Sequence, residues 1–142
     1  MTKIVFYKWD NTFYGFSEKG HTGYGESGDD VLCAALSAMT MLIINTIEVS
    51  YASDVDYTID EATTDIQVVA HGALKEYEAD DAKRFAISGL IQAYYYQLND
   101  MLEDYYEFLD VDVVEELIWS SLTAAEFRGT SITCNGGKPM LK

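Results

Sequence analysis

The chain has 142 residues, two cysteines and a formal net charge of −15 at pH 7. All of this net charge comes from the stretch between Glu48 and Glu116, where 18 acidic residues accompany three basic ones. This excess disfavours nucleic acid as a partner and favours a basic peptide, although a merely solvated acidic face has the same composition. Because Cys33 and Cys134 lack framework spacing and no signal peptide or membrane span is predicted, we expect one cytoplasmic domain.

The first elements are predicted to form a β-hairpin. Ile4 to Trp9 and Phe13 to Ser17 are rich in aromatic and β-branched residues, which favour strands. The residues between them, Asp10 to Thr12, are typical of a turn.

A glycine-rich loop, Gly20 to Gly28, is expected to precede a long helix. Asp29 or Asp30 would be its N-cap, because a short carboxylate accepts hydrogen bonds from the free N–H groups of the first turn. Apolar residues recur at helical spacing from Val31 to Ile47 and also occur on the other faces. The helix should therefore be largely buried.

A second hairpin and a second long helix follow. Tyr57 to Ile59 and Ile66 to Val69 flank a polar turn, and Ala79 to Leu109 has apolar residues at helical spacing. Amphipathic elements need one another to cover their apolar sides. These patterns predict an α+β fold in which a small antiparallel or mixed sheet of about four strands carries two long helices on one face.

The last part of the chain is predicted to be a helical extension. Val111 to Phe127 is interpreted as a third helix, and Arg128 to Lys142 as a fraying tail. Residues 1–112 would then be the main domain and residues 113–142 an extension of unknown role.

The residues best suited to chemistry lie around the glycine-rich loop. Cys33 is expected in the first turns of the first long helix, where the partial positive charge of unpaired N–H groups favours a thiolate. His21 is carried by the loop just before it and could accept the thiol proton. This pair predicts nucleophilic chemistry at sulfur.

The same segment resembles the ribosomal-processing cysteine proteases called Prp. The motif of that family is a Gly-His pair, spaced glycines, an Asp, two aliphatic residues, Cys-Ala and a Ser four residues after the Cys. In this sequence it is matched by Gly20-His21, Gly25, Gly28, Asp30, Val31-Leu32, Cys33-Ala34 and Ser37. The resemblance covers residues 1 to about 112.

The resemblance implies a dimeric bacterial protease that removes the N-terminal extension of large-subunit ribosomal protein twenty-seven, a basic peptide. By this likeness Cys33 is the nucleophile and His21 the general base. The residues implied in binding or positioning the substrate are Gly20, Gly25, Gly28, Asp30 and Ser37. No cofactor and no metal are implied.

The sequence also allows other interpretations. The tyrosine-rich second helix is also typical of a non-catalytic adaptor or dimerisation module that has kept the fold. Gly23 to Gly28 matches a dinucleotide-binding pattern, but neighbouring carboxylates would repel a pyrophosphate. Zinc is disfavoured because the histidines and cysteines lack ligand-pair spacing.

Overall fold

A computed structural model describes residues 1–20, 27–60, 63, 65–117, 133–134 and 138–139, with the backbone alone for residues 27–30 and for the last two pairs. The strands are β1 (Thr2–Trp9), β2 (Thr12–Lys19), β3 (Asp56–Ile59), β4 (Ile66–Val69), β5 (Leu109–Glu115), β6 (Thr133–Cys134) and β7 (Lys138–Pro139). The helices are α1 (Ser27–Asn45) and α2 (Asp81–Tyr105), with short turns η1 (Thr46–Ser50) and η2 (His71–Ala73).

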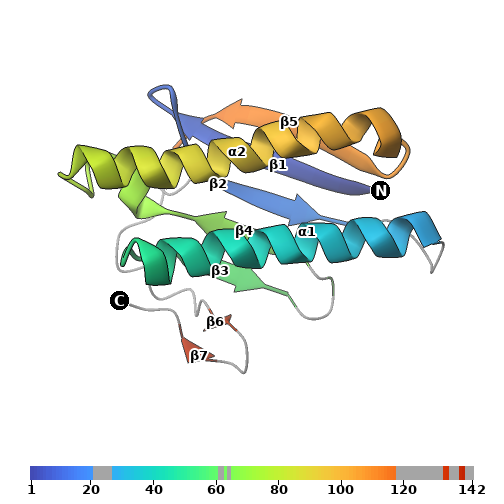
Figure 1. Cartoon of the computed structure of the whole chain (residues 1–142), viewed down its shortest axis with the longest axis horizontal. Coiled ribbons are helices and arrows are strands. Elements are labelled where there is room, and N and C mark those ends of the chain that lie inside the picture. Colours follow the sequence, from blue (N-terminus) through green and yellow to red (C-terminus); the bar gives the residue numbers. More distant parts are fainter. Residues whose placement is uncertain (21–26, 61–62, 64, 118–132, 135–137, 140–142) are drawn as a thin grey trace.

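The main sheet has five strands in the order β3-β4-β2-β1-β5. β5 pairs with β1 in parallel, and the other neighbours are antiparallel. α1 therefore links the parallel strands β2 and β3, and α2 links β4 and β5, since a parallel connection needs a crossover. Both helices lie on one face of the sheet and run in opposite directions (Figure 1).

Both predicted hairpins are confirmed. β1 pairs with β2, and Asp10 and Asn11 between them have φ values of 50° and 60°, as a tight hairpin turn requires. The register shifts once, so that Tyr14 is an extra residue of β2. β3 pairs with β4 in the second hairpin.

The two long helices are also present, with different ends. α1 begins at Ser27, so the prediction that Asp29 or Asp30 is its N-cap was wrong, and both residues lie in its first turn. α2 begins after Asp80, whose side chain accepts hydrogen bonds from the N–H groups of Ala82 and Lys83. Each helix is long enough to cross the sheet.

The prediction of a third helix was wrong for the part of it that the structure describes. Residues 109–115 form β5, which continues past the expected boundary at residue 112. Valine and aspartate alternate in this stretch, and β-branched residues fit a pleated edge better than a helix. In the tail expected to fray, β6 and β7 pair with each other, and residues 118–132 lie outside the described part.

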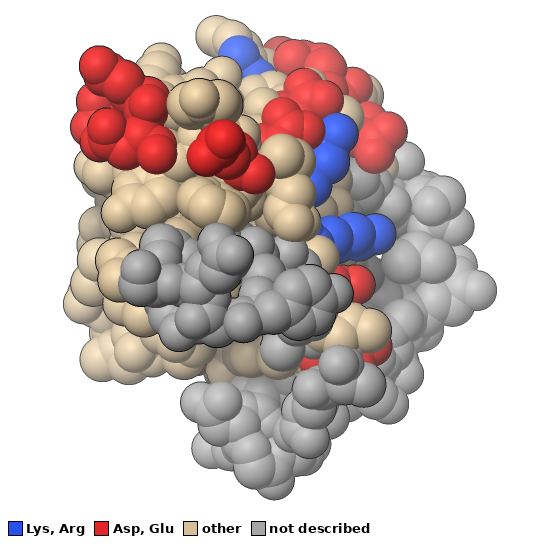
Figure 2. All heavy atoms as spheres, turned by 90° about the vertical axis from the view of Figure 1, so that its right-hand side faces the viewer, with Lys and Arg blue, Asp and Glu red and all other residues tan. Residues whose placement is uncertain are grey.

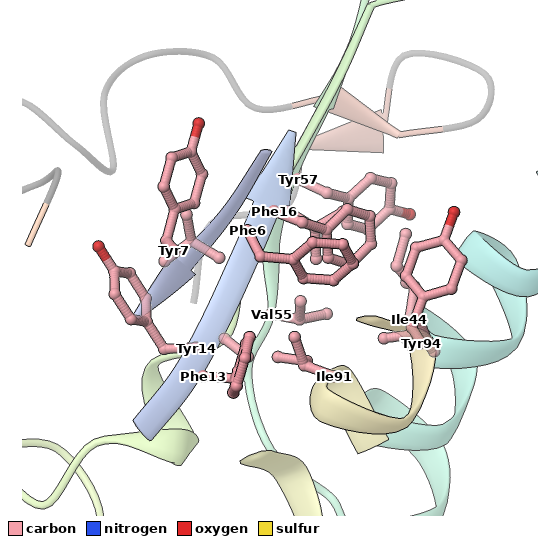
Figure 3. Packing of buried hydrophobic residues seen from close by; sticks show 14 of the residues in the cluster. Phe6, Tyr7, Phe13, Tyr14, Phe16, Ile44, Val55, Tyr57, Ile91 and Tyr94 are labelled. Atoms are coloured by element: carbon pink, nitrogen blue, oxygen red, sulfur yellow. The ribbon is translucent and has the colours of Figure 1, made fainter. Parts of the chain in front are cut away.

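The hydrophobic core lies between the sheet and the helices (Figure 3). Phe6 and Phe16 project from β1 and β2, and the ring of Tyr94 packs on both at centroid distances of 5.6 and 5.0 Å. Tyr7 and Tyr14 project from the opposite face of the sheet (Figure 3). The register thus sends one set of side chains toward the helices.

Among the described residues, one helical stretch is long and apolar enough to cross a bilayer, in contrast to the expectation from sequence. It is Val31–Ser50, with a mean hydropathy of 1.8. Leu32, Ile43 and Ile47 on its inner side are buried in the core, whereas Leu42 is exposed. A core helix passes the same test of length and composition, so this stretch is weak evidence for a membrane span.

Gly15 is predicted to be intolerant of a side chain because β4 packs directly on it. A Cβ there would lie 2.4 Å from the backbone oxygen of Val68. Gly15→Ala should lower the free energy of unfolding by about 2 kcal/mol or more. Gly89→Ala is the control: a Cβ there meets nothing within 4 Å, and alanine favours the helix by up to about 1 kcal/mol. Urea unfolding of both variants tests this, and equal midpoints would contradict it.

Candidate active site

Cys33 is exposed on α1 and lines a cavity of about 500 Å³. Ser37 lies one helical turn further along and lines the same cavity, as expected for residues four apart. The remaining lining residues come from β1, β2, α1, β3, β4 and the residue after β2: Thr2, Glu18, Gly20, Leu36, Thr40, Met41, Ile59 and Ile66. The cysteine of the sequence motif therefore opens onto a cavity of the size that holds small ligands or a peptide side chain.

Gly20 connects the cavity to the segment that carries His21. It follows β2 with φ +87°, and a Cβ there would lie 2.6 Å from the backbone oxygen of Met1, so glycine is required. Its N–H donates to Oδ1 of Asp65 at 3.2 Å. The chain is thus fixed beside the cavity one residue before His21.

The other motif residues are only partly described. His21 and Gly25 lie outside the described residues. Gly28 and Asp30 have helical backbone in the first turn of α1, and their side chains are not described. Of the seven predicted site residues, the structure brings Gly20, Cys33 and Ser37 together in one cavity.

The second histidine is at the wrong end of the sheet to act on Cys33 of the same chain. Ile66, at the start of β4, lines the cavity, whereas His71 follows the other end of this strand, about 10 Å further along. There its Nδ1 pairs with Oδ2 of the buried Asp56 at 3.4 Å. The other histidine of the chain, His21, directly follows the cavity residue Gly20 in the sequence and lies outside the described residues.

Glu18 is a site residue that the sequence analysis missed. Its side chain is only 6% exposed, although it lines the cavity. The hydroxyls of Thr40 and Tyr94 both donate to its Oε1, at 2.8 and 2.5 Å. The signal was the alternation of β2, because Glu18 lies two residues after the buried Phe16 and so shares its inward face.

Burial changes the acidity of this pair. Desolvation raises the pKa of Glu18 above its ordinary value of 4.5, and the hydrogen bonds from Tyr94 and Thr40 partly oppose this rise. The pKa of Tyr94 is also raised, first by burial and then by the neighbouring negative charge of Glu18. Within the described part of the chain, no ion pair involves Glu18.

Glu18→Gln is expected to stabilise the protein at neutral pH. Because the folded state binds the Glu18 proton more tightly than the unfolded state, stability falls as the pH rises from about 4.5 through the raised pKa. Glutamine cannot ionise, so it should add about 1 kcal/mol at pH 7 and nothing below pH 4. Thermal unfolding across this pH range measures the difference, with the exposed Glu76→Gln as control. A variant less stable than the native protein at pH 7 would contradict the expectation.

No group of three or more His, Cys, Asp or Glu side chains that could hold a metal ion occurs in the described ranges.

The model of the family described as cysteine protease Prp matches residues 1–110. The chain belongs to this family. It is accordingly a cysteine protease, which is the first of the two functions expected from the sequence. None of the curated proteins matches the sequence.

Solved structures share the α+β fold of this Prp family member. SMU.848 from Streptococcus mutans is 22% identical with a TM-score of 0.67, and the match covers 82% of this chain and 96% of that one. The ribosomal processing protease Prp from S. aureus, solved with a substrate peptide, is 18% identical with a TM-score of 0.65, covering 80% and 100%. The same protease with a covalently linked product peptide is 19% identical with a TM-score of 0.64, covering 80% and 100%.

Proposed function

We propose that this protease cuts peptide bonds by acyl transfer to Cys33, with His21 as general base. His21 accepts the thiol proton, the thiolate attacks the scissile carbonyl carbon, and the leaving amine takes the proton from the imidazolium. Water then hydrolyses the thioester, releasing the acid and the thiolate. Cys33 and His21 would thereby act as a dyad.

The observation that carries this proposal is the position of Cys33 in a cavity that also includes Gly20. The thiol is exposed, so a peptide can reach it, and Gly20 fixes the chain beside the cavity directly before His21. A buried cysteine elsewhere in the core would have argued for a packing role.

The start of α1 is suited to bind the oxyanion. Helical side chains lean toward the N-terminal end of their helix, so Cys33 leans over the first turn, which begins at Ser27. The first N–H groups of a helix have no partner within it, and they can donate to a developing negative charge. By the same resemblance, Asp30 and Ser37, with Gly25 and Gly28, would shape the site or position the substrate.

The substrate that we propose is the N-terminal extension of a large-subunit ribosomal protein. The S. aureus protease with the same fold is a ribosomal processing protease and was solved with a substrate peptide, which supports a substrate of this kind. Large-subunit ribosomal protein twenty-seven is the specific candidate. Figure 2 views the end of the molecule where α1 begins and α2 ends, and carboxylates gather on its upper part. The exposed acidic residues of α2 and β5 at this end are Asp100, Glu103, Asp104, Asp110 and Asp112. They would attract a basic peptide.

We also propose that the protein works in the bacterial cytoplasm as a homodimer. Three apolar side chains are exposed on α1 and on η1, which follows it: Val31, Leu42 and Val49. A second copy of the chain packed on them would remove these side chains from water. Light scattering after gel filtration should then give twice the mass of the chain. A monomeric mass at all concentrations would contradict the dimer.

The function is tested with a synthetic peptide that copies the N-terminal extension of the ribosomal protein. The native protein should cut it at one bond, and mass spectrometry of the two fragments locates that bond. Iodoacetamide should modify Cys33 faster than Cys134, and His21→Ala should remove the difference. Sluggish thiols of equal reactivity together with an intact peptide would argue against the dyad.

A further inference from the structure

Among the described residues, one oxygen of the Glu18 carboxyl group has hydrogen-bond partners and the other has none. The hydrogen bonds from Thr40 and Tyr94 both reach Oε1. Within the described part of the chain, Oε2 accepts no hydrogen bond. A carboxylate can accept on both oxygens, so a strong acceptor remains unused in a residue that lines the Cys33 cavity.

This unused acceptor is costly where it lies. Glu18 is 6% exposed, and the two hydrogen bonds to Oε1 replace only part of the hydration that a buried carboxylate loses. The adjacent Lys19 alternates to the opposite face of β2, and no described lysine or arginine pairs with Glu18. A ligand that brings a positive charge would offset this cost.

The rest of the cavity fits the remainder of such a ligand. Its walls include the apolar side chains of Leu36, Met41, Ile59 and Ile66. Lysine and arginine have aliphatic stems that pack on apolar surface and a charged head that seeks an acceptor. An aromatic or aliphatic side chain would fill the same space but leave Oε2 buried and unpaired.

We propose that the cavity beside Cys33 binds a lysine or arginine side chain of the substrate, and that Glu18 accepts its charged group. The assignment rests on the proposed function, because it assumes that peptides enter this cavity. Glu18 would be a specificity-determining residue, and the charge-assisted hydrogen bond would select a basic side chain over a neutral one of the same shape.

The first test does not need proteolysis. Aminoethyl and aminopentyl methanethiosulfonates react with a thiolate to give a mixed disulfide and methanesulfinate, and the uncharged ethyl and pentyl reagents do the same. Cys134 is replaced by serine so that only Cys33 reacts. The labelling rate with the charged reagent, divided by the rate with the uncharged one, then measures how strongly the cavity favours a positive charge. Glu18→Gln should lower this ratio about tenfold.

The control separates this local effect from the net charge of the whole molecule. Glu76→Gln removes one exposed charge away from the cavity and should leave the ratio unchanged. The ratio measured on the native protein should also rise with pH as Glu18 ionises, and this measurement needs no variant. Among the described residues, the other titratable groups that face Glu18 or the cavity are Tyr94 and Cys33. A ratio that is the same in Glu18→Gln and in the native protein would overturn the proposal.

The second test uses peptide pairs with lysine or norleucine at each position near the cut bond. The native protein should prefer lysine at one position by about tenfold in kcat/KM, and Glu18→Gln should lose this preference. Equal cleavage of both peptides by both proteins would overturn the lysine pocket and leave the protease function intact. If no peptide is cut while the labelling ratio still depends on Glu18, the proposed dyad fails and the cation pocket stands.

Discussion

Replacing Cys33 with alanine is expected to abolish cleavage of the ribosomal-protein peptide, with a fall in rate of at least about a thousandfold. The reason is that alanine has no group that can form the thioester, and the binding surface alone does not supply a nucleophile. Mass spectrometry of peptide incubated with the native protein or the variant measures the difference.

The second cysteine provides the matched control. Cys134 lies in β6, and Cys134→Ala removes the same atom from the other cysteine of the chain. This variant should keep the native rate. Cleavage that survives in Cys33→Ala, or is lost in Cys134→Ala alone, would remove Cys33 from the mechanism.

Phe6→Ala is expected to cost about 4 kcal/mol of the free energy of unfolding. The side chain is fully buried, and its ring contacts those of Phe13, Phe16, Tyr94 and Tyr95 at centroid distances of 5.3–6.2 Å. Truncation loses the burial of an aromatic ring and leaves a cavity between β1 and α2 that its neighbours can only partly fill. Denaturant unfolding, followed by circular dichroism, measures the loss.

A phenylalanine on the surface of α2 makes the comparison direct. Phe85 is 76% exposed, so Phe85→Ala removes the same atoms from a site that is already in water. Its effect should be below about 0.5 kcal/mol. If the two variants unfolded at similar denaturant concentrations, the placement of Phe6 at the centre of the core would be wrong.

Local patterns predicted the elements whose partners are near in sequence. The β1–β2 and β3–β4 hairpins follow from strand residues on either side of a polar turn, and the pairing of such neighbours is cheap because the loop is short. The long helices follow from the spacing of their apolar residues. The helix-bound cysteine of the motif could be placed for the same reason.

β5 was mistaken for a helix because its partner is distant. Aspartate alternates with apolar residues from Leu109 to Val113, which is a strand signal, but the sequence from Val111 onward was interpreted as a third helix. β5 pairs with β1, and nearly the whole domain lies between these two strands in the sequence. No local pattern specifies that a strand will pair at the edge of a sheet with so distant a partner. Tertiary context therefore decided this element.

The amino-acid sequence alone determined the hairpins, the two long helices and the Gly-His to Cys motif, since each depends on residues a few positions apart. The tertiary structure alone decided that β5 completes the sheet and that Glu18 lies buried beside the Cys33 cavity, held by Thr40 and Tyr94. Burial and pairing across the chain are properties of the packed molecule, because they depend on which distant surfaces meet and exclude water.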